Sequence, residues 1–188
     1  MRKRIVAFVF VLALVFVLAG TASAAVKQGD KEISFSGAYA DLTPSSDSDY
    51  GSVKATLLSG SLGYFVSDEA EFSAKGTWAW LKASGEKLNL YGIGFDAKYH
   101  FQPSNSTVPY VGAQWNYLNG KVSGDGSVID VSDTKASGQM WGPLAGIKFF
   151  VTDSTILFVE YQYDLFTGGA KDTIKNANIV CAGISFKF

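Results

Sequence analysis

The chain ends in a stretch whose residues alternate in character, Ile179-Val180-Cys181-Ala182-Gly183-Ile184-Ser185-Phe186-Lys187-Phe188. Successive side chains of an extended strand point to opposite sides, so this strand has one apolar side and one small or polar side. A soluble protein rarely ends on a bare aromatic residue of this kind, whereas the last strand of a membrane barrel places such a residue at a lipid interface. The ending therefore predicts a strand that closes a membrane-spanning barrel.

The same alternation recurs from Lys31 onward, without the sustained spacing of three to four residues that indicates helices. In the clearest segment, Tyr91, Ile93 and Phe95 alternate with glycine and aspartate. Strands are predicted over about residues 32–39, 52–66, 71–80, 91–101, 110–117, 141–151, 157–164 and 179–188. The pattern predicts an all-β fold, an eight-stranded antiparallel up-and-down transmembrane β-barrel.

The first 24 residues have the three parts of a secretory signal peptide. Residues 1–4 are mostly basic, residues 5–18 are continuously apolar, and Ala22-Ser23-Ala24 is a small-residue cleavage site. The apolar run is shorter than the roughly 20 residues that a spanning helix needs. We therefore expect residues 1–24 to be a cleaved signal peptide and residues 25–188 to be the barrel domain.

The composition of the exported chain excludes some classes of partner. Cleavage after residue 24 removes three of the 16 basic residues and both arginines, which leaves 13 lysines against 17 acids, a net charge of 13 − 17 = −4. We expect no nucleic-acid partner, because such a surface requires clustered lysine and arginine. Cys181, the single cysteine of the chain, cannot form an internal disulfide, so backbone pairing and packing must stabilise the fold.

Alternation alone does not separate a membrane barrel from a soluble lipocalin-like barrel, so the connections between strands are the first criterion. The predicted connections on one side are roughly ten, six, twenty and ten residues long, and those on the other side have about three to six. The longest covers residues 119–138 and is expected to extend its flanking strands as a hairpin. Long external loops and short periplasmic turns are typical of outer-membrane barrels.

The second criterion is the height of the aromatic residues along the strands. If the first strand runs outward, all four tryptophans fall near the outer ends of their strands, and a second group of aromatic residues falls near the periplasmic ends. We predict an aromatic girdle of Trp78, Trp80, Trp115, Trp141, Tyr99, Phe101, Phe186 and Phe188. A soluble core gives no reason to sort aromatic residues by height.

The third criterion is the placement of charge. No charged residue falls in the middle of the eight apolar faces, where a basic residue would cost about 2–4 kcal/mol in a membrane. The opposite faces carry charges freely, and we predict a barrel-interior polar network of Glu71, Lys75, Asp96, Lys98, Lys148, Glu160 and Lys187, together with Glu32 and Asp164. An eight-stranded barrel is only wide enough for side chains, so these charges should pair and plug the interior.

These features resemble the small outer-membrane β-barrel family of OmpA, OmpX and opacity-type proteins. The resemblance rests on the signal peptide, the eight amphipathic strands, Pro109-Tyr110-Val111-Gly112, tight turns after Phe-Val-Ser/Thr-Asp, and terminal Phe188. It covers nearly all of residues 25–188 and implies the outer membrane of a Gram-negative bacterium, with lipid and lipopolysaccharide around the barrel. It also implies insertion by the outer-membrane assembly machinery, with Phe188 as part of the assembly signal. The motifs specify the family better than any activity.

Few residues offer chemistry. His100 is the chain's only histidine. It is placed at the periplasmic end of its strand and lacks the His-x-Ser pattern of lipid-modifying barrel enzymes, so we interpret it as structural. The acidic loops lack the order of a calcium-binding loop, and Gly92-Ile93-Gly94 precedes no helix that could hold a nucleotide. We predict no catalytic residues, no metal and no cofactor.

The sequence leaves three functions open. The preferred one is a monomeric, non-enzymatic outer-membrane protein with a structural or surface-interaction role through its external loops. The first alternative is a small porin-like channel for ions or for small or hydrophobic solutes, with the interior charges along its path. The second alternative is a lipid-modifying outer-membrane enzyme that uses His100.

Overall fold

The computed structural model describes residues 26–44, 53–83, 86–101, 106–123, 136–168 and 174–188. Residues 1–24, predicted to be a signal peptide, lie outside this set. In the described part of the chain no helix is long and apolar enough to cross a membrane.

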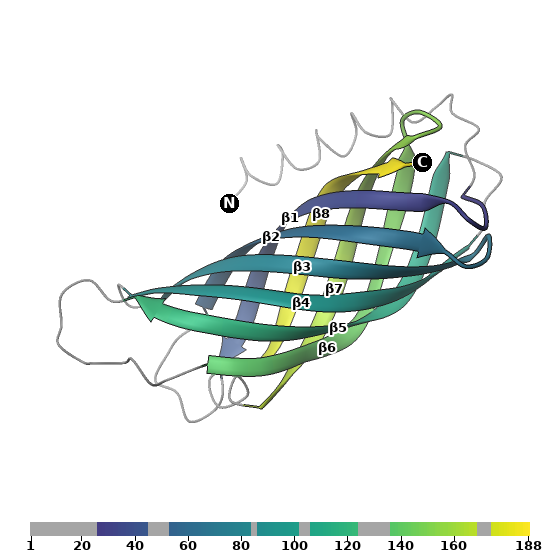
Figure 1. The fold of residues 1–188 in the computed structure, drawn as a ribbon. Coiled ribbons are helices and arrows are strands. Elements are labelled where there is room, and N and C mark those ends of the chain that lie inside the picture. Colours follow the sequence, from purple (N-terminus) through teal and green to yellow (C-terminus); the bar gives the residue numbers. More distant parts are fainter. Residues whose placement is uncertain (1–25, 45–52, 84–85, 102–105, 124–135, 169–173) are drawn as a thin grey trace.

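The described residues form eight strands that close into one antiparallel barrel, with each strand paired to its neighbours in chain order (Figure 1). The strands are β1 Lys31–Pro44, β2 Val53–Phe65, β3 Ala70–Ala83, β4 Glu86–His100, β5 Thr107–Ser123, β6 Ala136–Phe150, β7 Thr155–Gly168 and β8 Ile174–Lys187. Pairing of β1 with β8 closes the cylinder and leaves no strand edge unpaired, as a membrane requires. The predicted fold class is confirmed.

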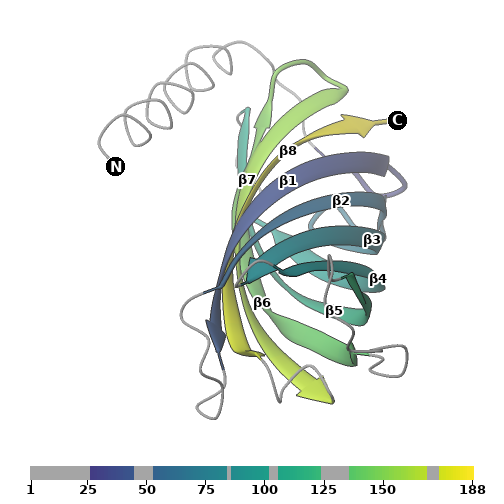
Figure 2. The same ribbon diagram turned by 90° about the vertical axis from the view of Figure 1, so that its left-hand side faces the viewer.

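The register determines the tilt of the strands. A line of paired residues that starts at Ile33 of β1 passes Leu62, Ala74, Phe95, Trp115, Trp141, Leu165 and Asn176 and returns to β1 at Thr43, a shift of 43 − 33 = 10 residues. With eight strands this shift corresponds to a tilt of about 40° from the barrel axis. Figure 2 shows the resulting oblique course of the strands around the axis.

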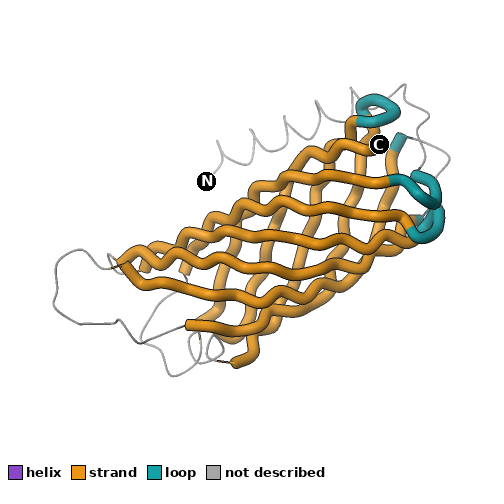
Figure 3. The backbone as a smooth tube through the Cα atoms, in the orientation of Figure 1, coloured by secondary structure: helices purple, strands orange, loops and turns teal. Residues whose placement is uncertain are grey.

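The described turns, at residues 66–69 and 151–154, lie at the same end of the barrel as Phe188, and the connection between residues 101 and 106 joins β4 to β5 at that end (Figure 3). We call this the turn end and the opposite end the loop end. The connections at the loop end span residues 45–52, 84–85, 124–135 and 169–173. Only two of these four are longer than all the connections at the turn end, so the predicted asymmetry is partly wrong. The strands continue further than their facing pattern suggested, because backbone pairing such as Glu86–Ala83 does not depend on which side chains face inward.

Alternation of exposure follows the predicted faces. Phe35, Leu62 and Ile93 stand on the outer wall with 56%, 61% and 71% of their surface exposed, whereas Glu71 and Asp96 point inward and are 2% exposed. Phe149 departs from this pattern, because it is buried where the alternation predicts an outward side chain. The barrel therefore has an apolar outer wall and a filled interior.

Candidate functional site

The interior of the barrel has a polar middle section built from side chains of several strands. Near the turn end, Lys148 Nζ of β6 lies 2.7 Å from Glu32 Oε2 of β1 and 2.9 Å from Glu71 Oε2 of β3. All three side chains are 1–2% exposed. The ammonium group also lies 5.2 Å from the centre of the Phe65 ring. A buried lysine with two carboxylate partners holds three strands together across the interior.

A second group of charges continues toward the loop end. Lys75 Nζ lies 2.9 Å from Asp96 Oδ1, and Lys98 Nζ lies 3.7 Å from Asp96 Oδ2 and 3.8 Å from Glu160 Oε2. The hydroxyl of Tyr110 donates a 2.8 Å hydrogen bond to Glu160 Oε2. Six of the seven residues predicted for the polar network therefore lie in the middle of the barrel and pair with one another or with Glu32.

Amides and hydroxyls satisfy part of the remaining polar atoms. Gln114 Nε2 donates to Gln162 Oε1 at 2.8 Å and to both carboxylate oxygens of Asp164 at 2.8 and 2.9 Å. The hydroxyls of Ser34 and Ser185 lie 2.8 Å apart, across the seam between β1 and β8. Asp164 belongs to the predicted interior network, whereas Gln114, Gln162, Ser34 and Ser185 fall on inward-facing positions without a predicted role.

Lys187 lies at the mouth of the turn end. Its Nζ is 3.3 Å from Asp30 Oδ2 and 5.8 Å from the centre of the Phe150 ring, and its side chain is 16% exposed. Asp30 belongs to the segment before β1, which folds back over the mouth. There Gly29 N donates to Phe65 O at 2.9 Å and Gln28 N donates to Asp68 Oδ1 at 2.7 Å. Lys187 thus lies at the edge of the interior, where the segment before β1 meets the end of β8.

Apolar layers lie on both sides of the polar section, which the prediction of a small and polar interior missed. The layer at the turn end contains Val26, Phe65, Val108, Phe150 and Ile156, all with at most 3% exposure. The layer at the loop end contains Ala40, Ala55, Ala79, Leu118, Met140, Phe166, Ala177, Ile179 and Cys181. The apolar layers could have been predicted from apolar residues on inward-facing positions near the strand ends, such as Leu118 and Phe166. Two cavities in the interior have volumes of about 30 and 20 Å³, close to the space that one water molecule needs.

His100 does not form a catalytic arrangement with the residues around it. It is fully buried at the turn end, between the rings of Phe65 and Tyr110 at centroid distances of 5.1 and 5.3 Å. Its Nδ1 lies 3.2 Å from the carbonyl oxygen of Glu69, and its Nε2 lies 3.4 Å from Glu71 Oε2. A general base must reach the proton of a bound substrate, and a side chain enclosed in this way cannot. Among the described residues no group of three His, Cys, Asp or Glu side chains could hold a metal ion.

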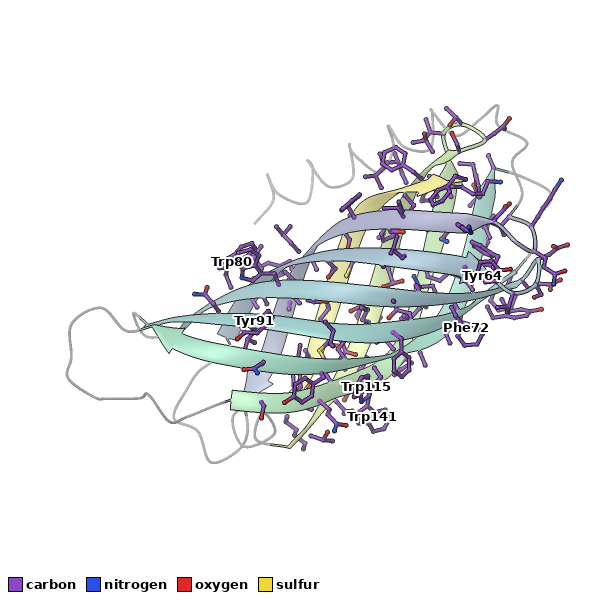
Figure 4. The ribbon with its side chains drawn as sticks, in the orientation of Figure 1. Tyr64, Phe72, Trp80, Tyr91, Trp115 and Trp141 are labelled. Atoms are coloured by element: carbon purple, nitrogen blue, oxygen red, sulfur yellow. The ribbon has the colours of Figure 1, made fainter. Side chains whose placement is uncertain are left out.

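The residues predicted for the aromatic girdle lie at two heights on the outer wall, and Figure 4 shows Trp80, Trp115 and Trp141 nearer the loop end than Phe72 and Tyr64. The ten-residue shift raises each paired position by about one residue per strand toward the loop end, which places Trp78, Trp115 and Trp141 within about 4 Å of one another along the axis. Trp80 lies about 5 Å further toward the loop end. Tyr99, Phe101, Phe186 and Phe188 lie near the turn end, with 51%, 48%, 44% and 66% of their surface exposed.

Comparisons with known proteins agree with this geometry. The chain is similar to Neisserial surface protein A (NspA) in its solved structure, with a TM-score of 0.68, 24% identity, and coverage of 86% of this chain and 100% of that one. It is also similar to the N-terminal β-barrel domain of Pseudomonas aeruginosa OprF, with a TM-score of 0.50, 25% identity, and coverage of 86% and 98%. For the outer membrane protein OprG from Pseudomonas aeruginosa the TM-score is 0.52, the identity 14%, and the coverage 89% and 99%. No curated protein matches the chain.

A family model decides the assignment. The model for the outer membrane protein beta-barrel domain matches residues 10–188 and so covers nearly the whole chain. The closed eight-stranded barrel, its apolar outer wall and its charged interior are typical of outer-membrane barrels. The chain therefore belongs to the outer membrane protein β-barrel domain family and is a protein of the Gram-negative outer membrane.

Proposed function

We propose that the protein is a sealed, non-catalytic and non-conducting barrel that acts at the cell surface through the loops at its loop end. The observation that carries this proposal is the filling of the interior by two apolar layers with a paired polar section between them. A hydrated ion crossing the barrel would have to separate ion pairs in the middle and displace packed side chains at both ends. Because its own side chains fill the interior, the barrel would contact partners through its loops.

The proposal includes the orientation, the association state and the route of insertion. The turn end faces the periplasm and the loop end faces the exterior, in the arrangement usual for outer-membrane barrels. The protein is a monomer surrounded by phospholipid and lipopolysaccharide, with the tryptophan group as part of an aromatic girdle. The assembly machinery inserts it, with Phe188 as part of the recognised ending. Residues 1–24 are the cleaved signal peptide.

Recording in planar bilayers tests the seal. The purified protein should give no reproducible single-channel steps, with a general porin measured under the same conditions as the positive control. Steady, uniform steps that scale with the amount of inserted protein would refute the seal and favour the porin-like channel.

Replacing residues 124–135 with a glycine-serine linker tests the role of the loops. The variant should fold, as judged by different gel migration before and after boiling, because the linker leaves β5 and β6 intact. Cells that produce the wild type should aggregate or adhere to surfaces more than cells that produce the variant. Equal adhesion at equal surface levels would argue against a role for this loop. A change in the lipid A mass spectrum on overproduction would instead support an enzyme.

A further inference from the structure

The outer wall has a groove of about 650 Å³ on one side of the barrel, over β4, β5 and β6. Its volume is in the range of small-molecule sites, although it faces the membrane and not the interior. The outward-facing residues that line it are all uncharged, namely Ala70, Phe72, Ala97, Tyr99, Val111, Pro143, Ala145, Tyr161 and Tyr163.

Small side chains in adjacent strands form the floor of the groove. Ala97 of β4 pairs with Ala113 of β5, and Val111 of β5 pairs with Ala145 of β6, so three neighbouring strands have short outward side chains at the same place. Pro143 continues this floor along β6. Tyr99 of β4 and Tyr161 of β7 stand at the two ends of the paired line through Val111 and Ala145, so large rings flank the short side chains. The depression therefore comes from a local change in side-chain size.

Aromatic rings form the two walls. Phe72 and Tyr99 stand on the side of β3 and β4, and Tyr161 and Tyr163 stand on β7 (Figure 4 labels Phe72). Tyr99 and Tyr161 are separated by three strand spacings, about 14 Å between their backbones. The Tyr161 hydroxyl donates a 2.5 Å hydrogen bond to Asn178 Oδ1 on β8, which fixes the position of this hydroxyl. The groove is thus wide, apolar and bounded by aromatic side chains.

We propose that this groove binds the acyl chains of a phospholipid from the periplasmic leaflet as a specific, slowly exchanging lipid. The outer wall faces the membrane, so lipid is the molecule that the groove meets. Acyl chains can lie along the alanine floor and contact rings on both sides, whereas an unfilled depression would lose dispersion contacts on every face. The choice of leaflet follows from height, because Tyr99 and Phe72 lie near the turn end, and it rests on the proposed orientation of the barrel.

A second copy of the protein fits the groove less well. Another barrel presents a convex wall, which would meet the protruding rings of Phe72 and Tyr161 before it reached the alanine floor. Flexible acyl chains do not have this restriction. A dimer through this face is therefore the competing outcome of the experiment.

Native mass spectrometry of the full-length mature protein tests the proposal. The protein is folded in vesicles of phosphatidylethanolamine, transferred to mild detergent, and analysed for retained lipid. The wild type should retain one phosphatidylethanolamine. Ala145→Phe fills the floor with a ring, and loss of contact with about two methylene groups should lower the retained fraction on the order of tenfold. Ala182→Phe is the matched control, since Ala182 is an exposed alanine at about the same height on β8.

The outcomes separate the alternatives. Retention that is equal in Ala145→Phe and Ala182→Phe, or no retained lipid in the wild type, would overturn the proposal. A wild-type dimer that Ala145→Phe converts to a monomer would identify a second copy as the occupant and would also overturn it. Different gel migration before and after boiling checks that each variant is folded. None of these readouts depends on conductance or on the loops, so this proposal and the proposed function can fail separately.

Discussion

Replacing Lys148 with methionine removes the ammonium group that lies between the carboxylates of Glu32 and Glu71, at 2.7 and 2.9 Å. The two carboxylates are 1–2% exposed and would remain in the interior without this partner. The hydroxyls of Ser34 and Ser73 still donate to them, at 2.9 and 3.3 Å. Hydroxyl donors compensate only part of the desolvation of a carboxylate.

Removal of one partner from a buried ion pair typically costs about 3–5 kcal/mol. We expect Lys148→Met to lower the free energy of unfolding by this amount, because the methionine occupies a similar volume and the change is mainly electrostatic. At about 1.4 kcal/mol per tenfold change in an equilibrium constant, the ratio of folded to unfolded protein falls by roughly 100- to 4,000-fold.

Reversible unfolding in guanidinium chloride, with the protein in lipid vesicles and tryptophan fluorescence as the readout, measures this change. The matched control is the triple variant Glu32→Gln, Glu71→Gln and Lys148→Met, which removes all three charges together. Neutral groups of similar volume often replace a buried ion pair at little cost, so the triple variant should recover most of the lost stability.

Two results would refute the reasoning. A loss below about 1 kcal/mol for Lys148→Met would mean that water reaches the carboxylates and screens them. A triple variant as unstable as the single one would mean that Lys148 acts through packing against Phe65 and not through its charge.

Three further predictions concern packing, closure and the membrane. Gly142→Ala should destabilise the barrel by about 1–3 kcal/mol, because the added methyl group would overlap the carbonyl oxygen of Tyr163. The control is Gly76→Ala, whose methyl group meets open space, so its stability should be unchanged or slightly higher. Unfolding in guanidinium chloride compares the two variants. Deleting Phe188 removes two backbone hydrogen bonds to Lys31, at 2.9 and 3.0 Å, and should reduce the amount of assembled protein in outer-membrane fractions. Phe188→Ala keeps these two bonds and tests the aromatic ring alone. Unchanged amounts of assembled protein in both variants would contradict the role of Phe188 in assembly. Single-tryptophan variants that retain Trp78 or Trp141 should be quenched at the same depth by brominated lipids, and clearly different depths would argue against a girdle.

Some features of the interior could be predicted from the sequence because a strand alternates with a period of two. Once the faces are assigned, Glu71 and Asp96 must point inward and Ile93 must point outward, whatever the neighbouring strands do. The partner of each inward side chain, in contrast, depends on other strands. Asp164 accepts hydrogen bonds from Gln114 on β5, and Lys187 pairs with Asp30 at the mouth, so two residues predicted for the interior network have partners outside it.

The sequence by itself determined the number of strands, their two faces and the membrane environment, because these follow from short-range periodicity and from the absence of charge on one face. Only the tertiary structure decided which inward residues meet, since the ten-residue shift around the barrel sets the height of every side chain. That shift brings Glu32, Glu71 and Lys148 together from three strands and separates the apolar layers from the polar section. It also gathers short side chains of β4, β5 and β6 into one groove, a property of the register between strands that alternation within a single strand does not contain.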